Sequence, residues 1–253
     1  MSSITIASIA CAFIFGGALL GLLLRAFLPE HHLTGEAKDV VKLGAGLIAT
    51  LAALVLGLLV SSAFSSLDTM NSELTQASAK IIVLDRVLAK YGPETKEARD
   101  LLRGGVATAI GRTWPEEKAG QGRVDSAEVT ADIDRIQEKL RELSPRDNSQ
   151  RLLQAQALQI AAELTHARWL LIEQTQGSLP EAFLIVLLFW LTMLFVSFGM
   201  LAPRNATVIT VLLVCAVSVS GAIFLILEMN SPLTGMIKVS SAPLRNALDH
   251  LGK

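Results

Sequence analysis

The hydrophobic residues of the chain gather in four runs, each long enough to cross a lipid bilayer as a helix. About 20 apolar residues span the hydrocarbon core of a membrane. The runs cover residues 4–24, 43–67, 182–202 and 206–227, and none of them contains a charged residue. The first run lacks the positive start and the cleavage site of a signal peptide, which favours a span. The pattern predicts an all-α membrane protein with four transmembrane helices.

A polar segment of about 110 residues separates the second run from the third, and its apolar residues keep the three- and four-residue spacing of helices. No stretch of it alternates as a strand does. Its first helix places the following residues on one face: Leu67, Met70, Leu74, Ala77, Ile81, Leu84 and Leu88. Gly92 and Pro93 are expected to end this helix, because glycine suits a helix C-terminus and proline a first turn. The segment is therefore predicted to be a helical bundle.

These patterns divide the chain into four parts. Residues 1–67 form transmembrane helices 1 and 2, residues 68–177 the soluble bundle, residues 178–228 a transmembrane hairpin, and residues 229–253 a tail with a short amphipathic helix. Four spans place both termini and the bundle on one side of the membrane. Lys and Arg near the span ends are equally frequent on both sides, so the positive-inside rule does not decide which side is cytoplasmic. The lack of a disulfide framework and of a signal peptide favours a cytoplasmic bundle.

The second run continues into the bundle without a helix breaker. Residues 46–69 contain no proline, and their last glycine is Gly57. One heptad stripe can be traced from Leu88 back through Ala63, Val60 and Ala53 to Gly46. We therefore expect one uninterrupted helix from residue 46 to residue 88, anchored in lipid at one end and in the bundle at the other.

A second stripe of the same helix carries small, hydroxyl and bulky apolar side chains. Its residues are Thr50, Leu54, Gly57, Ser61, Phe64, Ser65 and Asp68. Small and hydroxyl residues commonly let two membrane helices pack closely. The alternative is a water-filled pore, in which hydroxyls face water and a ring of Phe64 side chains forms an apolar constriction. Composition alone favours packing, and these seven residues are the candidate pore-lining set.

Charged and catalytic residues narrow the function. No span has an ionisable residue in its interior, and Arg25 and Glu228 lie at span ends, which argues against a proton relay or an ion-coupled transporter. His31 and His32 are adjacent, and this spacing does not suit a shared metal ion. A formal charge of −1 gives no reason to expect nucleic acid. The sequence contains no catalytic motif, so we expect no enzyme, no cofactor and no metal site.

The tail is expected to end in a helix that Ser241 caps, with Leu244, Leu248 and Leu251 on one side. Such a helix could lie among lipid headgroups or dock on the bundle.

Three separated segments resemble the bacterial bestrophin-like membrane proteins. They are "LPEHHLTGEAKDVVKLGAGLIATLAALVLGLLVSSA", "LDRVLAKYGPETKEARDLLR" and "SPLTGMIKVSSAPLRNAL". Bestrophins are pentameric chloride channels whose second span lines a narrow apolar neck, so the resemblance implies a homo-oligomer, a pore along the second span and chloride or another small ion as the partner. The second span here carries one Phe instead of a series of aromatic rings, and the chain has no acidic cluster like the bestrophin calcium clasp.

Two hypotheses follow from these observations. The first is an oligomeric ion channel of the bacterial inner membrane, with second-span helices around the axis and anions as candidate ions. The second is a non-conducting membrane sensor or scaffold that uses its bundle to bind a partner, because a continuous helix can also transmit rotation or sliding.

Overall fold

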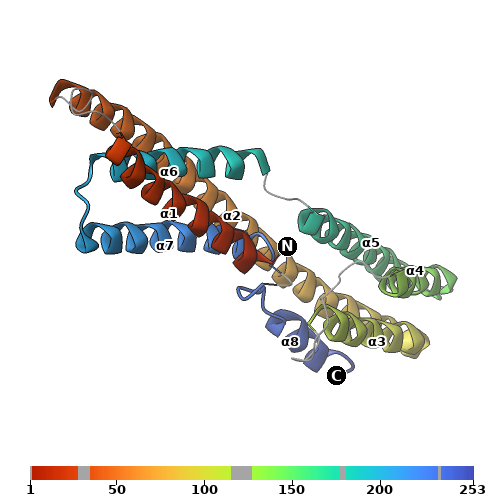
Figure 1. Ribbon diagram of the computed structural model, residues 1–253. Coiled ribbons are helices and arrows are strands. Elements are labelled where there is room, and N and C mark those ends of the chain that lie inside the picture. Colours follow the sequence, from red (N-terminus) through yellow and green to blue (C-terminus); the bar gives the residue numbers. More distant parts are fainter. Residues whose placement is uncertain (1, 28–34, 115–126, 177–180, 233–234) are drawn as a thin grey trace. The chain divides into compact units, whose positions relative to one another are not determined.

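The computed structural model describes residues 2–27, 35–114, 127–176, 181–232 and 235–253, and its secondary structure there is helical, without strands. The prediction of an all-α membrane protein is confirmed, because four of the helices are long and apolar enough to cross a membrane. The helices are α1 (Ser3–Phe27), α2 (Gly35–Tyr91), the 3-10 turn η2 (Pro93–Thr95), α3 (Lys96–Thr113), α4 (Ala127–Glu142), α5 (Asn148–Gln176), α6 (Glu181–Leu201), α7 (Ala206–Met229) and α8 (Ala242–His250). Figure 1 labels them along the chain.

Helix α2 is one unbroken helix of 57 residues, as the lack of a breaker predicts. It ends at Tyr91, and Gly92 follows with a φ of 139°, a conformation that residues with a Cβ rarely adopt. Pro93 then opens the 3-10 turn that leads into α3. The chain as a whole divides into two compact units, residues 1–65 with 178–230 and residues 66–177 with 231–253, and α2 contributes to both.

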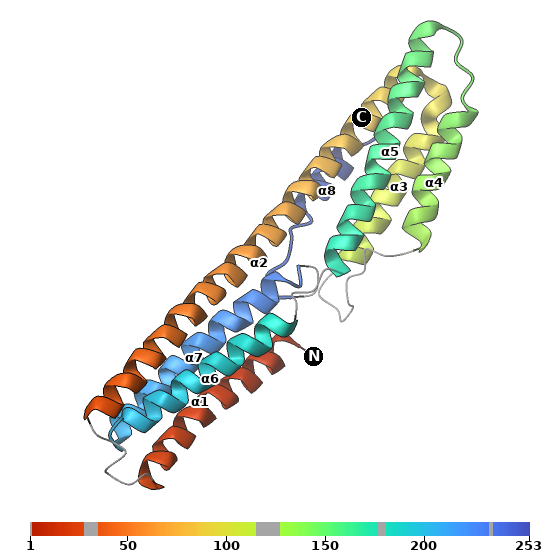
Figure 2. The ribbon, with the colours of Figure 1, turned by 90° about the horizontal axis from the view of Figure 1, so that it is seen from above.

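The first unit consists of α1, α6, α7 and the first part of α2, which run alongside one another in Figure 2. Its tightest contact is between α1 and α6. A Cβ on Gly21 would collide with the backbone carbonyl of Val196, and a Cβ on Gly199 would collide with that of Ala18. The Gly17-x-x-x-Gly21 spacing therefore marks a close crossing of two backbones, which is the packing that small residues permit in membranes.

Two arginines join the C-terminal ends of these same helices. Arg25 of α1 donates to the carbonyl oxygens of Leu201 and Ala202 at the end of α6. Arg204, just after α6, donates to Leu22 O of α1 at 2.8 Å. Helix ends leave carbonyl groups without intrahelical partners and carry partial negative charge. Arg25 therefore caps the end of α6, and Arg204 adds a second link from the end of α6 to the last turns of α1.

The second unit is a helical bundle made of α3, α4, α5 and the latter part of α2. The predicted stripe of α2 supplies much of its core, since Met70, Leu74, Ile81, Leu84 and Leu88 are all buried. The fold also buries one carboxylate, because Asp85 is only 1% exposed. Its two oxygens accept hydrogen bonds from Arg99 Nε at 2.7 Å and Arg99 Nη2 at 2.9 Å, so the charge is paired where α2 meets α3.

The C-terminal helix α8 packs on this bundle, which decides between the two predicted positions. Leu244, Ala247 and Leu251 are buried in the bundle core, with Leu248 packed against it. Ser241 lies at the N-cap position of α8, as predicted, but its side chain makes no capping hydrogen bond. Its backbone is helical, with φ −75° and ψ −7°, and its hydroxyl accepts a hydrogen bond from Arg245 Nε at 3.0 Å.

The heptad traced along α2 holds from Ala63 to Leu88 and fails before Ala63. Ala53 and Gly46 are exposed, and the buried positions are Ala45, Ala52 and Leu59. Two consecutive four-residue steps, from Leu59 to Ala63 and on to Leu67, change the position of the apolar stripe around the helix. The change occurs where α2 passes from the first unit to the second. Such an insertion of four residues breaks a continuous heptad register.

Candidate functional site

The candidate pore-lining residues all lie on one exposed face of α2. Thr50, Leu54, Gly57, Ser61, Phe64, Ser65 and Asp68 are each exposed in the chain. Leu54 and Phe64 are both 61% exposed, although both belong to an apolar span. The structure therefore places the whole predicted set on one surface that the rest of the chain leaves uncovered.

The opposite face of α2 is the one that packs. Ala52, Leu59 and Ala63 are buried in the core that α1, α6 and α7 also form. Each lies two residues after an exposed candidate, namely Thr50, Gly57 and Ser61, and a separation of two residues is about 200° around a helix. Within the chain, the small residues of this span that pack against other helices are Ala52 and Ala63. Packing within one subunit therefore does not explain the small and hydroxyl residues on the candidate face.

The hydroxyl groups on the exposed face have local partners available. Thr50 Oγ1 donates to Gly46 O at 2.9 Å, one turn earlier in the helix. A hydroxyl bonded in this way is tolerated in an apolar environment and still has an oxygen that can accept a hydrogen bond from water. This face can therefore border either lipid or a hydrated pore.

The composition of α6 gives one reference for a surface that faces lipid. The exposed side chains on α6 are all apolar among those described, and they are Ala182, Phe183, Ile185, Val186, Phe189, Met193 and Phe198. This is the composition expected of a lipid-facing surface. The exposed stripe of α2 differs, since hydroxyl groups and Gly57 interrupt its large apolar residues.

The charge along this face changes where α2 enters the second unit. Residues 43–67 carry no charge, and Asp68 is the first ionisable residue after them. Asp68 lines an open groove between α2 and α5, together with Ser72, Gln76, Lys80 and Glu163. Lys80 Nζ and Glu163 Oε2 lie 3.0 Å apart. The hydrogen bond from Lys80 is the main cause that lowers the pKa of Glu163 below its ordinary value.

Sequence reasoning missed two features of the bundle. The first is the buried pair of Asp85 and Arg99. The sign of it in the sequence is a carboxylate directly after Leu84, a residue of the buried apolar stripe. The second is an apolar cavity whose lining includes Arg112 and Arg168. Its lining comes from five segments far apart in the sequence, so no local pattern could indicate it. Among the described residues no group of three His, Cys, Asp or Glu side chains could hold a metal ion, and His31 and His32 lie outside the described residues.

Comparison with known proteins gives the family. The model of the Bestrophin-like domain matches residues 12–244, nearly the whole chain. The chain belongs to the Bestrophin-like family. The prediction of this membership from the three sequence segments is confirmed.

Solved structures of bacterial bestrophin homologues have the same fold. A crystal structure of a variant of such a homologue from Klebsiella pneumoniae matches with a TM-score of 0.70 and 14% identity, covering 100% of this chain and 99% of that one. A second variant matches with a TM-score of 0.67 and 15% identity, over 95% and 99% of the two chains. A crystal structure described as a membrane protein also matches, with a TM-score of 0.63 and 14% identity, over 95% and 99%. No functionally curated protein matches the chain.

Proposed function

We propose that this protein is an oligomeric ion channel of the bacterial inner membrane, with α2 helices around its axis. The observation that carries the proposal is the contrast between two exposed surfaces. That of α6 is apolar throughout its described residues, whereas that of α2 presents Thr50, Gly57, Ser61 and Ser65. An uncovered membrane face with hydroxyl groups suits a hydrated pore better than acyl chains.

The buried face of α2 supports the same arrangement. Ala52 and Ala63 anchor the helix to its own subunit, so a ring of subunits would turn the opposite face towards the common axis. Phe64 would then form the apolar constriction, and Asp68 would form a ring of carboxylates at the exit. The family resemblance makes a pentamer the expected assembly. The bundle and both termini are assigned to the cytoplasm.

Chloride is the first ion to test, because the resemblance is to chloride channels. A ring of Asp68 carboxylates would by itself favour cations. The conducted species is therefore proposed as chloride or another small ion, and the reversal potential under a salt gradient distinguishes the two signs of charge.

The test uses purified protein in liposomes with both native cysteines, Cys11 and Cys215, replaced by alanine. Ser61→Cys is introduced on the proposed pore face and Ile185→Cys on the exposed apolar face of α6, where Ile185 is 65% exposed. A membrane-impermeant thiol reagent is expected to block ion flux through the Ser61→Cys protein and to leave the Ile185→Cys protein unaffected.

Two results would contradict the proposal. A protein that passes no current or halide flux across voltages and membrane tensions is not a channel, and the sensor or scaffold hypothesis would replace it. Flux that the reagent leaves unchanged at Ser61→Cys would retain conduction but remove α2 as the pore lining.

A further inference from the structure

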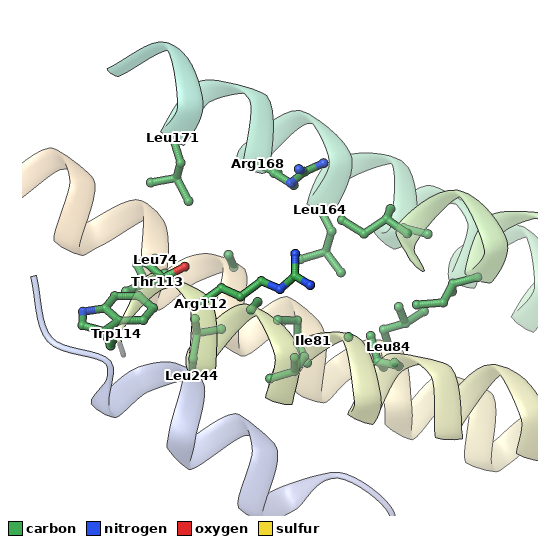
Figure 3. A pocket seen from close by; sticks show the side chains of 18 of the residues that line it. Leu74, Ile81, Leu84, Arg112, Thr113, Trp114, Leu164, Arg168, Leu171 and Leu244 are labelled. Atoms are coloured by element: carbon green, nitrogen blue, oxygen red, sulfur yellow. The ribbon is translucent and has the colours of Figure 1, made fainter. Parts of the chain in front are cut away.

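The bundle contains a cavity of about 160 Å³ whose walls are almost entirely apolar. The walls come from α2, α3, α4, α5 and the C-terminal segment, all within the second unit. Figure 3 shows part of this lining, which includes Leu74, Ile81, Leu84, Leu164, Leu171 and Leu244. Protein interiors contain few voids larger than a water molecule, so a space of this size in a small bundle is unusual.

The polar groups of the lining already have partners or are too few to hold water. The indole Nε1 of Trp114 donates to Val239 O at 2.8 Å. Arg112 and Arg168 each interact with another group of the protein, so their charges give no reason to expect an added anion. Thr113 is the one hydroxyl residue of the described lining, whereas a water in a cavity needs roughly two to four polar partners. The cavity therefore suits neither an acid nor a cluster of water molecules.

We propose that this cavity binds a compact, neutral, apolar molecule of about the size of benzene. An engineered protein cavity of about 150 Å³ with leucine, isoleucine and phenylalanine walls stays dry and binds benzene, and the volume and lining here are similar. Such a guest would restore the van der Waals contacts that the wall side chains lack. Molecules of this class concentrate in membranes, so a protein anchored in the bilayer meets them at raised local concentration.

A guest in this position would contact several helices of the bundle at once. Leu84 of α2, Leu102 of α3 and Leu244 of α8 all line the cavity. A ligand that binds only the packed bundle stabilises that state by mass action. The site would therefore let a membrane-soluble apolar molecule tighten the bundle around α2, the same helix that carries the candidate pore face.

The experiment uses the full-length protein in lipid nanodiscs and iodobenzene as the probe, because its iodine quenches tryptophan fluorescence on contact. Trp169→Phe with Trp190→Phe leaves Trp114, which lines the cavity, as the only tryptophan. We expect quenching that saturates as the cavity fills. Trp114→Phe with Trp190→Phe is the matched control, since it leaves Trp169, which is 55% exposed and outside the lining. The quenching of Trp169 should rise in proportion to the probe concentration.

Three competitors test the size and charge of the site. Benzene should displace iodobenzene and restore the Trp114 fluorescence. Triphenylmethane should not, because its three rings exceed the cavity volume. Benzoate should compete at least roughly tenfold less well than benzene, since its charge would leave water for an apolar site without gaining a cation. Empty nanodiscs give the share of each compound that dissolves in the lipid, so that binding is compared at equal free concentration.

One substitution fills the cavity. Ala109→Leu adds a larger side chain to the wall, and the lost space should weaken iodobenzene binding at least roughly tenfold. Ala107→Leu is the control, because Ala107 lies on the exposed side of the same helix, outside the lining. The comparisons of size and charge need no change in the wall, so they test the site even if Ala109→Leu does not fold.

Four results would overturn the proposal. They are quenching of Trp114 that does not saturate, quenching of Trp169 that saturates alike, benzoate or triphenylmethane that competes as well as benzene, and a folded Ala109→Leu protein that binds iodobenzene unchanged. Binding is measured without ion flux, so these outcomes are independent of whether the protein conducts.

Discussion

Asp85 and Arg99 form a two-pronged ion pair across the contact between α2 and α3, with oxygen–nitrogen distances of 2.7 and 2.9 Å. The Asp85 side chain is 2% exposed and that of Arg99 is 23% exposed. The backbone N–H of Gly252 donates to the same carboxylate at 3.2 Å, so the pair also holds the C-terminus on the bundle.

Removal of Arg99 should therefore destabilise the bundle. Arg99→Leu leaves a buried carboxylate without its cation, and loss of one partner of a buried pair costs about 3 kcal/mol or more. We expect a clearly lower thermal unfolding midpoint of the purified protein. Lys139→Gln is the control, because Lys139 lies 3.5 Å from Glu97 in a surface pair that contributes little. Equal shifts in the two variants would contradict a special role for the buried pair.

The same carboxylate predicts a loss of stability in acid. Burial raises the pKa of Asp85, but the hydrogen bonds from Arg99 and Gly252 and the charges of Arg99 and Arg86 outweigh burial, so the pKa lies below its ordinary value of 3.8. A lowered pKa in the folded state stabilises the fold above the ordinary pKa, and this contribution is lost as the pH falls through the folded-state value. The unfolding midpoint should fall more steeply below pH 4 for the natural protein than for Asp85→Asn. Parallel curves would show that other carboxylates dominate.

Two glycines of α1 differ in their surroundings, so replacing each by alanine should change stability in opposite directions. Gly21→Ala places a methyl group against the backbone of Val196, and overpacking of this kind costs roughly 1–3 kcal/mol. Gly16→Ala lies in the same helix with no atom near its Cβ position, so it should keep or raise stability, because alanine favours helices over glycine. Thermal unfolding in one detergent compares the two, and an equal loss would mean that the close crossing at Gly21 is not what makes its substitution costly.

Much of the fold could be predicted because its signals are local. The four spans are long apolar runs, and Gly92 with Pro93 marks the end of α2 by backbone preference alone. The contacts that join distant segments have no such signal. Arg25 caps α6 across 177 residues of sequence, and a heptad count could not anticipate that the stripe of α2 shifts at Ala63, because this shift depends on which helices surround each half.

The candidate site divides in the same way. The sequence predicted which residues of α2 share a face, since helical periodicity determines this, and the structure places Thr50 and Ser61 on an exposed surface. That this surface lines a pore stays a prediction. What covers that surface depends on other subunits, and one sequence does not encode their arrangement in any local pattern. The place of Arg112 and Arg168 could not be predicted for a related reason. In the sequence each is an ordinary arginine of a helix, and only the fold brings both to one cavity.

Phe64 offers the sharpest test of the proposed constriction. A ring of phenylalanines would keep the narrowest part of the pore dry and hold back ions. Phe64→Ala should therefore widen and wet it, and raise ion flux into liposomes several-fold. Phe189→Ala is the matched control, because Phe189 is 56% exposed on α6 and Phe64 is 61% exposed on α2, so both variants remove the same group from an exposed position in a span. If both variants raise the flux alike, the effect comes from general loosening of the membrane part. If neither does, the barrier to ions lies elsewhere than at Phe64.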